Sequence, residues 1–222
     1  MIGARMRSFV RRIGAAAGAV LFYVRRASTG NRGESKDRAL LRFSEQAEQH
    51  FCFLQNKGFR CVRHDPTFVR FESQSLFVNL YHGRKSFELG LELGRLGSSE
   101  NAFPMWHLLK AAAAPGAEKY LDYVARTPVA VENGLRRLAA LFRGHVLEIL
   151  SDPQLFRILD RQRSDEVERL ERDVKLEQVR QALAVAWNSR DFDQVVRLLD
   201  PVKCELAPSE LKKLQYARKR AQ

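Results

Sequence analysis

The stretch "FVNLYHGRKSFELGLELG" (residues 77–94) decides the fold, because it has the pattern of two apolar strands around a tight turn. In its second half, apolar residues alternate with Glu and Gly, so one face of that strand enters a core and the other does not. Gly83 suits the turn because glycine adopts a positive φ at low cost. The stretch predicts an antiparallel hairpin that carries Glu88 and Glu92 on its outer face.

The hairpin belongs to a longer run of strand-like segments. Short gaps separate four such segments, so the simplest arrangement is a four-stranded antiparallel meander. Ahead of them, apolar residues at spacings of three and four predict an amphipathic helix that ends near Gly58. The predicted strands are residues 59–62, 67–72, 76–82 and 86–94.

After the meander the pattern becomes helical and stays so. The predicted helices are residues 105–114, 117–126, 128–150 and 153–189. The last is heavily charged with a thin apolar stripe, which indicates an exposed connector or, alternatively, a short coiled coil. The fold class is therefore α+β: an N-terminal helix, a four-stranded antiparallel meander, and an all-helical C-terminal half with one long exposed helix.

Composition divides the chain into three predicted parts. Residues 1–36 form a basic extension, residues 37–150 the α+β domain, and residues 151–222 the long helix and a helical hairpin. The net charge of +12 is concentrated at the ends: residues 1–33 hold seven arginines and no acid, and residues 212–220 add five bases. Basic segments bind nucleic acid or anionic membrane, so both ends are candidates for such a partner, with solvated tails as the alternative.

The apolar run Ile13–Val24 is too short for a membrane-spanning helix, which needs about twenty residues. Three interpretations stay open for residues 1–26: a disordered extension, an interfacial helix and an export signal. Export is disfavoured because Arg25 and Arg26 stand where a signal peptide has its neutral cleavage region. The predicted location is the cytoplasm, with peripheral membrane association through residues 1–26 as an alternative.

The sequence carries no recognisable motif for chemistry. It has no nucleophile elbow, zinc-protease motif, dinucleotide fingerprint or phosphate loop. Its three cysteines have no C-x-x-C spacing, which argues against a disulfide framework and a structural zinc site and favours a reducing compartment. We therefore predict no catalytic residue, no metal and no small-molecule cofactor.

The outer face of the predicted sheet mixes charged, amide and aromatic side chains. With the turn included, the candidate binding residues are Arg70, Glu72, Asn79, Tyr81, Arg84, Glu88 and Glu92. Glycines beside the two glutamates of the last strand leave room for another backbone or a ligand. The functional interpretation is a protein-binding surface, and the alternative is cross-strand pairing alone. A carboxylate enzyme site, with Glu72 and Glu88 close together on neighbouring strands, is a further alternative.

A hairpin pattern Tyr-x-Gly-Arg-x-Ser-x-Glu is matched by Tyr81, Gly83, Arg84, Ser86 and Glu88. With the preceding Phe-x-x-Leu and Gly-Phe, residues 40–96 resemble a type of small bacterial α+β domain of unknown function. Some domains of that type are similar to immunity proteins that neutralise a neighbouring toxin. The resemblance carries no established activity, and the similarity to immunity proteins is an analogy at the level of the fold. We predict a non-enzymatic protein-binding module.

Near the C-terminus, small residues at 182 and 186, Trp187 and the turn at Asp191-Phe192 resemble one tetratricopeptide-type repeat. A stable array needs about three repeats. Two interpretations therefore stay open for this stretch: a terminal helical hairpin packed on the domain, or a peptide-binding groove.

Overall fold

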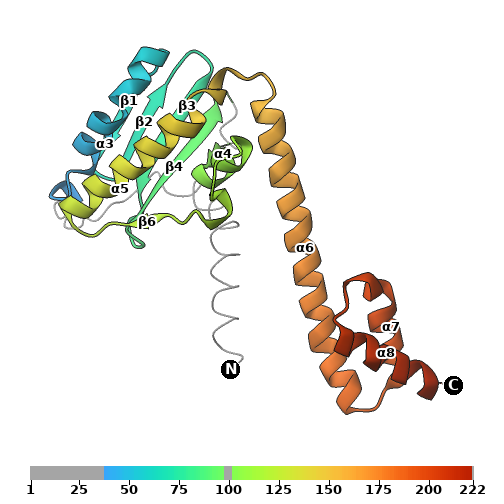
Figure 1. The fold of residues 1–222 in the computed structure, drawn as a ribbon. Helices are drawn as coiled ribbons and strands as arrows, with labels where there is room; N and C mark the ends of the chain where they lie inside the picture. Colours follow the sequence, from blue (N-terminus) through green and yellow to red (C-terminus); the bar gives the residue numbers. More distant parts are fainter. Residues whose placement is uncertain (1–37, 98–101, 222) are drawn as a thin grey trace. The chain divides into compact units, whose positions relative to one another are not determined.

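The computed structural model describes residues 38–97 and 102–221. The chain divides into two compact units, unit 1 ending at Leu159 and unit 2 beginning at Asp160 (Figure 1). Unit 1 combines helices with an antiparallel sheet, and unit 2 is helical, so the predicted α+β class with a helical C-terminal half is confirmed. The predictions for residues 1–36 lie outside the described residues.

Unit 1 contains the predicted meander. The strands are β1 (Arg60–Asp65), β2 (Phe68–Glu72), β3 (Leu76–His82), β4 (Glu88–Arg95), β5 (Ala102–Pro104) and β6 (Tyr123–Val124). β1 to β4 pair antiparallel in chain order, as predicted. The helices are α3 (Phe43–Phe51), η1 (Cys52–Lys57), α4 (Met105–Ala111), η2 (Ala117–Lys119), α5 (Pro128–Leu141), η3 (Phe142–Val146) and η4 (Ile149–Ser151).

Two strands were not predicted, and one predicted helix is wrong. β5 and β6 both pair antiparallel with β4, at opposite ends of that strand. The segment 117–126, predicted as a helix, forms only the short turn η2 and then β6. Long-range pairing decides this, because β6 meets Glu88 and Leu89 of β4 and Ala125 donates its amide to the Phe87 carbonyl at 2.8 Å.

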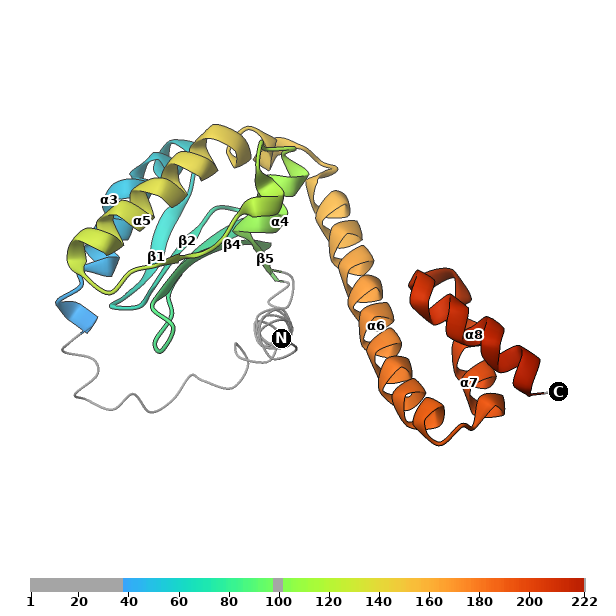
Figure 2. The ribbon, with the colours of Figure 1, turned by 60° about the horizontal axis from the view of Figure 1, so that its bottom comes forward.

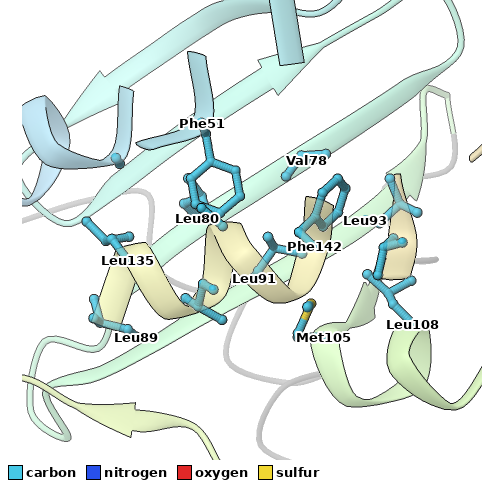
Figure 3. Packing of buried hydrophobic residues seen from close by; sticks show 14 of the residues in the cluster. Phe51, Val78, Leu80, Leu89, Leu91, Leu93, Met105, Leu108, Leu135 and Phe142 are labelled. Atoms are coloured by element: carbon cyan, nitrogen blue, oxygen red, sulfur yellow. The ribbon is translucent and has the colours of Figure 1, made fainter. Parts of the chain in front are cut away.

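The core of unit 1 lies between one face of the sheet and its helices. Figure 2 shows α3 and α5 on the same side of the sheet. The leucines of β4 lie there in one hydrophobic cluster with Phe51 of α3 and Phe142 of η3 (Figure 3). Fully buried strand residues on this face are Val69, Phe71, Val78, Leu80, Leu89, Leu91 and Leu93. For β4, the expectation that its apolar residues enter the core is confirmed at Leu89, Leu91 and Leu93.

The turn between β3 and β4 differs from its prediction. The left-handed conformation falls on Phe87, at φ 59°, and not on Gly83. The Gly83 amide donates to the Glu88 carbonyl at 2.8 Å, and the Phe87 amide donates to the Gly83 carbonyl at 2.9 Å. The Arg38 guanidinium lies 3.9 Å from the centroid of the Phe87 ring. These contacts hold an aromatic residue in a conformation that normally favours glycine.

His82 is buried at the end of β3 and links three segments. Its Nε2 lies 2.8 Å from the Ala125 carbonyl, which can only accept, so Nε2 carries the proton. Nδ1 therefore accepts from Arg38 Nη1 at 3.2 Å. The ring stacks on Phe43 at a centroid distance of 5.7 Å. Burial, aided by the Arg38 charge, lowers the pKa of His82.

Unit 2 is a set of packed helices. It comprises α6 (Leu155–Asn188) from residue 160 on, α7 (Phe192–Leu199), η5 (Asp200–Glu205) and α8 (Pro208–Arg220). Its core residues are Leu183, Ala186, Val195, Leu199, Leu214 and Ala217. Asp191 caps α7 by accepting from the Gln194 amide at 2.9 Å, and Arg180 pairs with Glu210 at 2.8 Å. The predicted long helix is confirmed. The resemblance of the C-terminal hairpin to a tetratricopeptide repeat stays a prediction.

No helix within residues 38–97 and 102–221 is both long and apolar enough to cross a membrane.

We predict that unit 1 loses stability as the pH falls below about 6.5, the ordinary pKa of histidine. The unfolded chain then takes up a proton at His82, whereas the folded chain resists it, so the free energy of unfolding decreases. One such group changes the free energy of unfolding by at most about 1.4 kcal/mol per pH unit. Urea unfolding at about pH 7.5 and 5.5, followed by Trp106 fluorescence in a Trp187→Phe background, measures it.

His82→Gln retains one donor and one acceptor and should flatten this pH dependence. Part of it should remain, because burial and the Arg136 charge also lower the pKa of His50. The matched control is His145→Gln, at a half-buried histidine of η3, which should leave the difference between the two pH values unchanged. Equal slopes for wild type and His82→Gln would contradict the role given to His82.

Candidate functional site: the polar face of the sheet

The polar face is the face of the sheet opposite α3 and α5, and the register orders its residues in rows across β2, β3 and β4. The rows are Phe68–Tyr81–Gly90, Arg70–Asn79–Glu92 and Glu72–Phe77–Gly94. Glu88 lies on the same face of β4, two residues before Gly90, and Arg84 lies exposed in the adjoining turn. The structure thus brings Arg70, Asn79 and Glu92 side by side, which the sequence could not specify.

Two aromatic rings occupy the space above the glycines of β4. A Cβ at Gly90 would overlap the ring of Tyr81, and a Cβ at Gly94 would overlap the ring of Phe77. Both glycines are buried, and Phe77 is only 2% exposed. The expectation that these glycines leave room for a ligand is therefore wrong, because side chains of β3 fill that room and complete a packed surface.

Arg70 is fixed at the centre of the polar face by three contacts. Its Nε donates to Glu72 at 2.6 Å, and its Nη1 lies 3.4 Å from Oδ1 of the buried Asn79. Its guanidinium lies 4.0 Å from the centroid of the Phe77 ring. The Arg70–Glu72 pair is partly shielded, with side-chain exposures of 25% and 29%. Arg70 is thus held in place without a ligand.

The acidic end of the polar face consists of Glu88, Glu92 and Asp122, around Tyr81. Burial first, and then the charges of these carboxylates, raise the pKa of Tyr81 well above its ordinary value. Partial removal from water, with the nearby Glu88 charge, raises the pKa of Asp122 to about 6, although a hydrogen bond with Tyr120 opposes this. Tyr81 therefore stays a phenol at neutral pH, where it can donate a hydrogen bond but not act as a base.

Glu72 and Glu88 are not close together. Glu72 aligns through Phe77 with Gly94, which is six residues along β4 from Glu88. With a rise of about 3.3 Å per residue and about 4.8 Å between strands, their Cα atoms lie roughly 20 Å apart. A glycosidase pair needs about 5–9.5 Å.

Within the described ranges, no group of three His, Cys, Asp or Glu residues could hold a metal ion.

Within the described residues, β1 is an edge strand of the sheet, and its features oppose the addition of another strand. β1 has an irregular register between Cys61 and Arg63, which places the exposed Val62 in a bulge. Arg63 and Asp65 form an ion pair at 2.6 Å, and Arg63 also lies 4.8 Å from the Phe68 ring centroid. A bulge and charged side chains discourage pairing with another chain at this edge.

Residues from outside the predicted strands also border the polar face. Arg63 belongs to β1, which continues to Asp65 beyond its predicted end. Strand alternation alone would have assigned Arg63 to the face of Cys61, which packs against the core, because the alternation does not reveal the bulge at Val62 that turns Arg63 to the polar face. Tyr120 and Asp122 lie just before β6, in a segment predicted as helix. No local signal in the sequence indicates that they approach Glu88.

The fold and the polar face define an α+β protein built on a mainly meander-ordered antiparallel sheet. No protein-family model, no curated protein and no solved structure matches the chain. The resemblance of residues 40–96 to a small bacterial domain type accordingly stays a prediction.

We predict that Gly90→Ala destabilises unit 1 by about 1–3 kcal/mol, because the new methyl group displaces the Tyr81 ring. In a Tyr81→Ala background the overlap is gone, and the same change should become neutral or stabilising, since Ala costs less backbone entropy than Gly. Urea unfolding of the four variants, followed by Trp106 fluorescence without Trp187, measures the coupling.

The control for the Gly90 cycle is Gly144→Ala, because a Cβ at Gly144 meets no atom within 4 Å. It should change stability little or raise it. If Gly90→Ala costs the same with and without the Tyr81 ring, the ring does not occupy the space above the glycine.

Proposed function

We propose that the protein is a non-enzymatic protein-binding module whose partner docks on the polar face. The observation that carries the proposal is the row Arg70–Asn79–Glu92, set between two aromatic rings that fill the space above Gly90 and Gly94. Such a surface is already packed and ordered before a partner arrives, so less conformational entropy is lost on binding.

Charge supports the choice of partner. Glu88, Glu92 and Asp122 gather at one end of the polar face, so a partner that presents Lys or Arg side chains there matches its charge. Tyr81 beside them supplies an amphipathic ring of the kind enriched at interfaces. The separation of Glu72 from Glu88 does not favour an enzyme site that pairs these two carboxylates.

The finer parts of the proposal rest on residue-level resemblance and composition. In this proposal the protein is bacterial and cytoplasmic and acts as an immunity-like protein. Unit 2 contributes a tetratricopeptide-like hairpin. A basic surface on a toxin would match the acidic end, which is consistent with this interpretation.

The test is capture of a partner from nuclease-treated lysate at low and high salt, followed by binding measurements with the purified partner. We expect one stoichiometric protein that survives high salt, because a packed interface depends less on salt than charge-driven binding to nucleic acid. Glu88→Lys/Glu92→Lys should abolish binding by reversing the charge of the acidic end. Hydrogen exchange should show protection of β3 and β4 in the complex.

The matched control is Glu171→Lys/Glu177→Lys, which changes the net charge equally on the exposed surface of α6. It should bind the purified partner like wild type. Equal loss in both double variants would show that net charge governs the association. A complex that protects no amide of β3 or β4 would place the interface away from the polar face.

A further inference from the structure

α8 carries a basic stripe with one aromatic residue on its outer side. The outer stripe consists of Lys212, Gln215, Tyr216, Lys219 and Arg220, all exposed and spaced as one helical face. The opposite side of α8 packs into the core of unit 2 through Leu214 and Ala217. The orientation of α8 is therefore fixed, and its cations are directed to the surface of unit 2.

Most other charges around α8 are neutralised locally. Arg218 pairs with Asp200 at 2.5 Å, and Glu210 pairs with Arg180. In the described residues, by contrast, no carboxylate pairs with Lys212, Lys219 or Arg220. The outer stripe therefore presents a concentrated positive charge, whereas unit 2 as a whole contains almost as many acids as bases.

Tyr216 is a supported aromatic surface in the middle of this charge. The residue is 45% exposed. Behind it, the ring centroids of Trp187 and Phe192 each lie 5.6 Å away, so the ring is held by its neighbours. Arg220 lies 5.5 Å from the Tyr216 centroid and Lys213 lies 5.4 Å from that of Trp187. Two cations thus lie against two aromatic rings that pack on each other.

We propose that the outer stripe of α8 binds single-stranded nucleic acid, with a base stacked at Tyr216 and phosphates at Lys212, Lys219 and Arg220. With a rise of about 1.5 Å per residue, Lys212 and Arg220 lie roughly 6 Å along the helix on either side of Tyr216. Proteins that bind single strands without sequence preference combine basic side chains with such stacking residues. An anionic membrane fits less well, because insertion needs an apolar face and the apolar face of α8 is packed in the core.

The test uses the full chain and a fluorescein-labelled oligothymidylate of about 15 nucleotides, within the range bound by small single-strand modules. Fluorescence anisotropy over a salt series gives the dissociation constant and its salt dependence. Tyr216→Ala should weaken binding about five- to a hundredfold through loss of stacking. Lys212→Gln/Lys219→Gln should reduce the slope of log affinity against log salt by about 1.4.

The matched control is Arg161→Gln/Lys175→Gln, which removes two exposed charges from α6 and should leave the affinity nearly unchanged. In a Trp106→Phe background, the oligonucleotide should quench Trp187, which lies against Tyr216. The same fluorescence in urea shows whether each variant keeps unit 2 folded.

The proposal is overturned if wild type does not bind the oligonucleotide at low salt. It is also overturned if the Tyr216 and Lys212/Lys219 variants bind like wild type, because the binding would then belong to another segment, such as the arginines of residues 1–33. Binding to phosphatidylserine vesicles without binding to the oligonucleotide would assign the stripe to a membrane instead.

Discussion

The alternation of leucine with glycine and glutamate along β4 is the constraint on which unit 1 depends. Its leucines form the middle of the core under α3 and α5. Its glycines accept the rings of Phe77 and Tyr81 from β3. Because the strand has period two, a slip of one residue would bring Glu92 into the core and a leucine beneath these rings. One strand thereby fixes both the packing of the helices and the composition of the polar face.

The local parts of the fold could be predicted because their signals are local. Strand alternation gave the four strands of the meander within a few residues, and the 3.6-residue period gave α3, α5 and α6. β6 could not be predicted in the same way, since Tyr123 and Val124 become a strand only by pairing with Glu88 and Leu89. The residues next to β6 in the sequence give no local signal for that pairing.

The candidate site was predictable as a set of residues but not as an arrangement. Alternation assigned Arg70, Asn79 and Glu92 to one face, whereas their alignment in a row depends on the register between strands. The glycines were misinterpreted for a related reason. A glycine in a strand leaves space, but only the neighbouring strand determines whether that space receives a ligand or a ring of the same chain.

Each of the two proposed surfaces contains an arginine that lies over an aromatic ring, but the charges around the two arginines differ. Arg70 lies over Phe77, but Glu72 neutralises it, so it mainly orders the polar face. Arg220 lies over Tyr216 with no carboxylate beside it among the described residues, so its charge remains available to a phosphate. An ion-paired guanidinium has already exchanged water for a fixed partner, whereas an unneutralised one gains by releasing counterions from nucleic acid. This difference is why we assign a protein partner to unit 1 and a polyanion to unit 2.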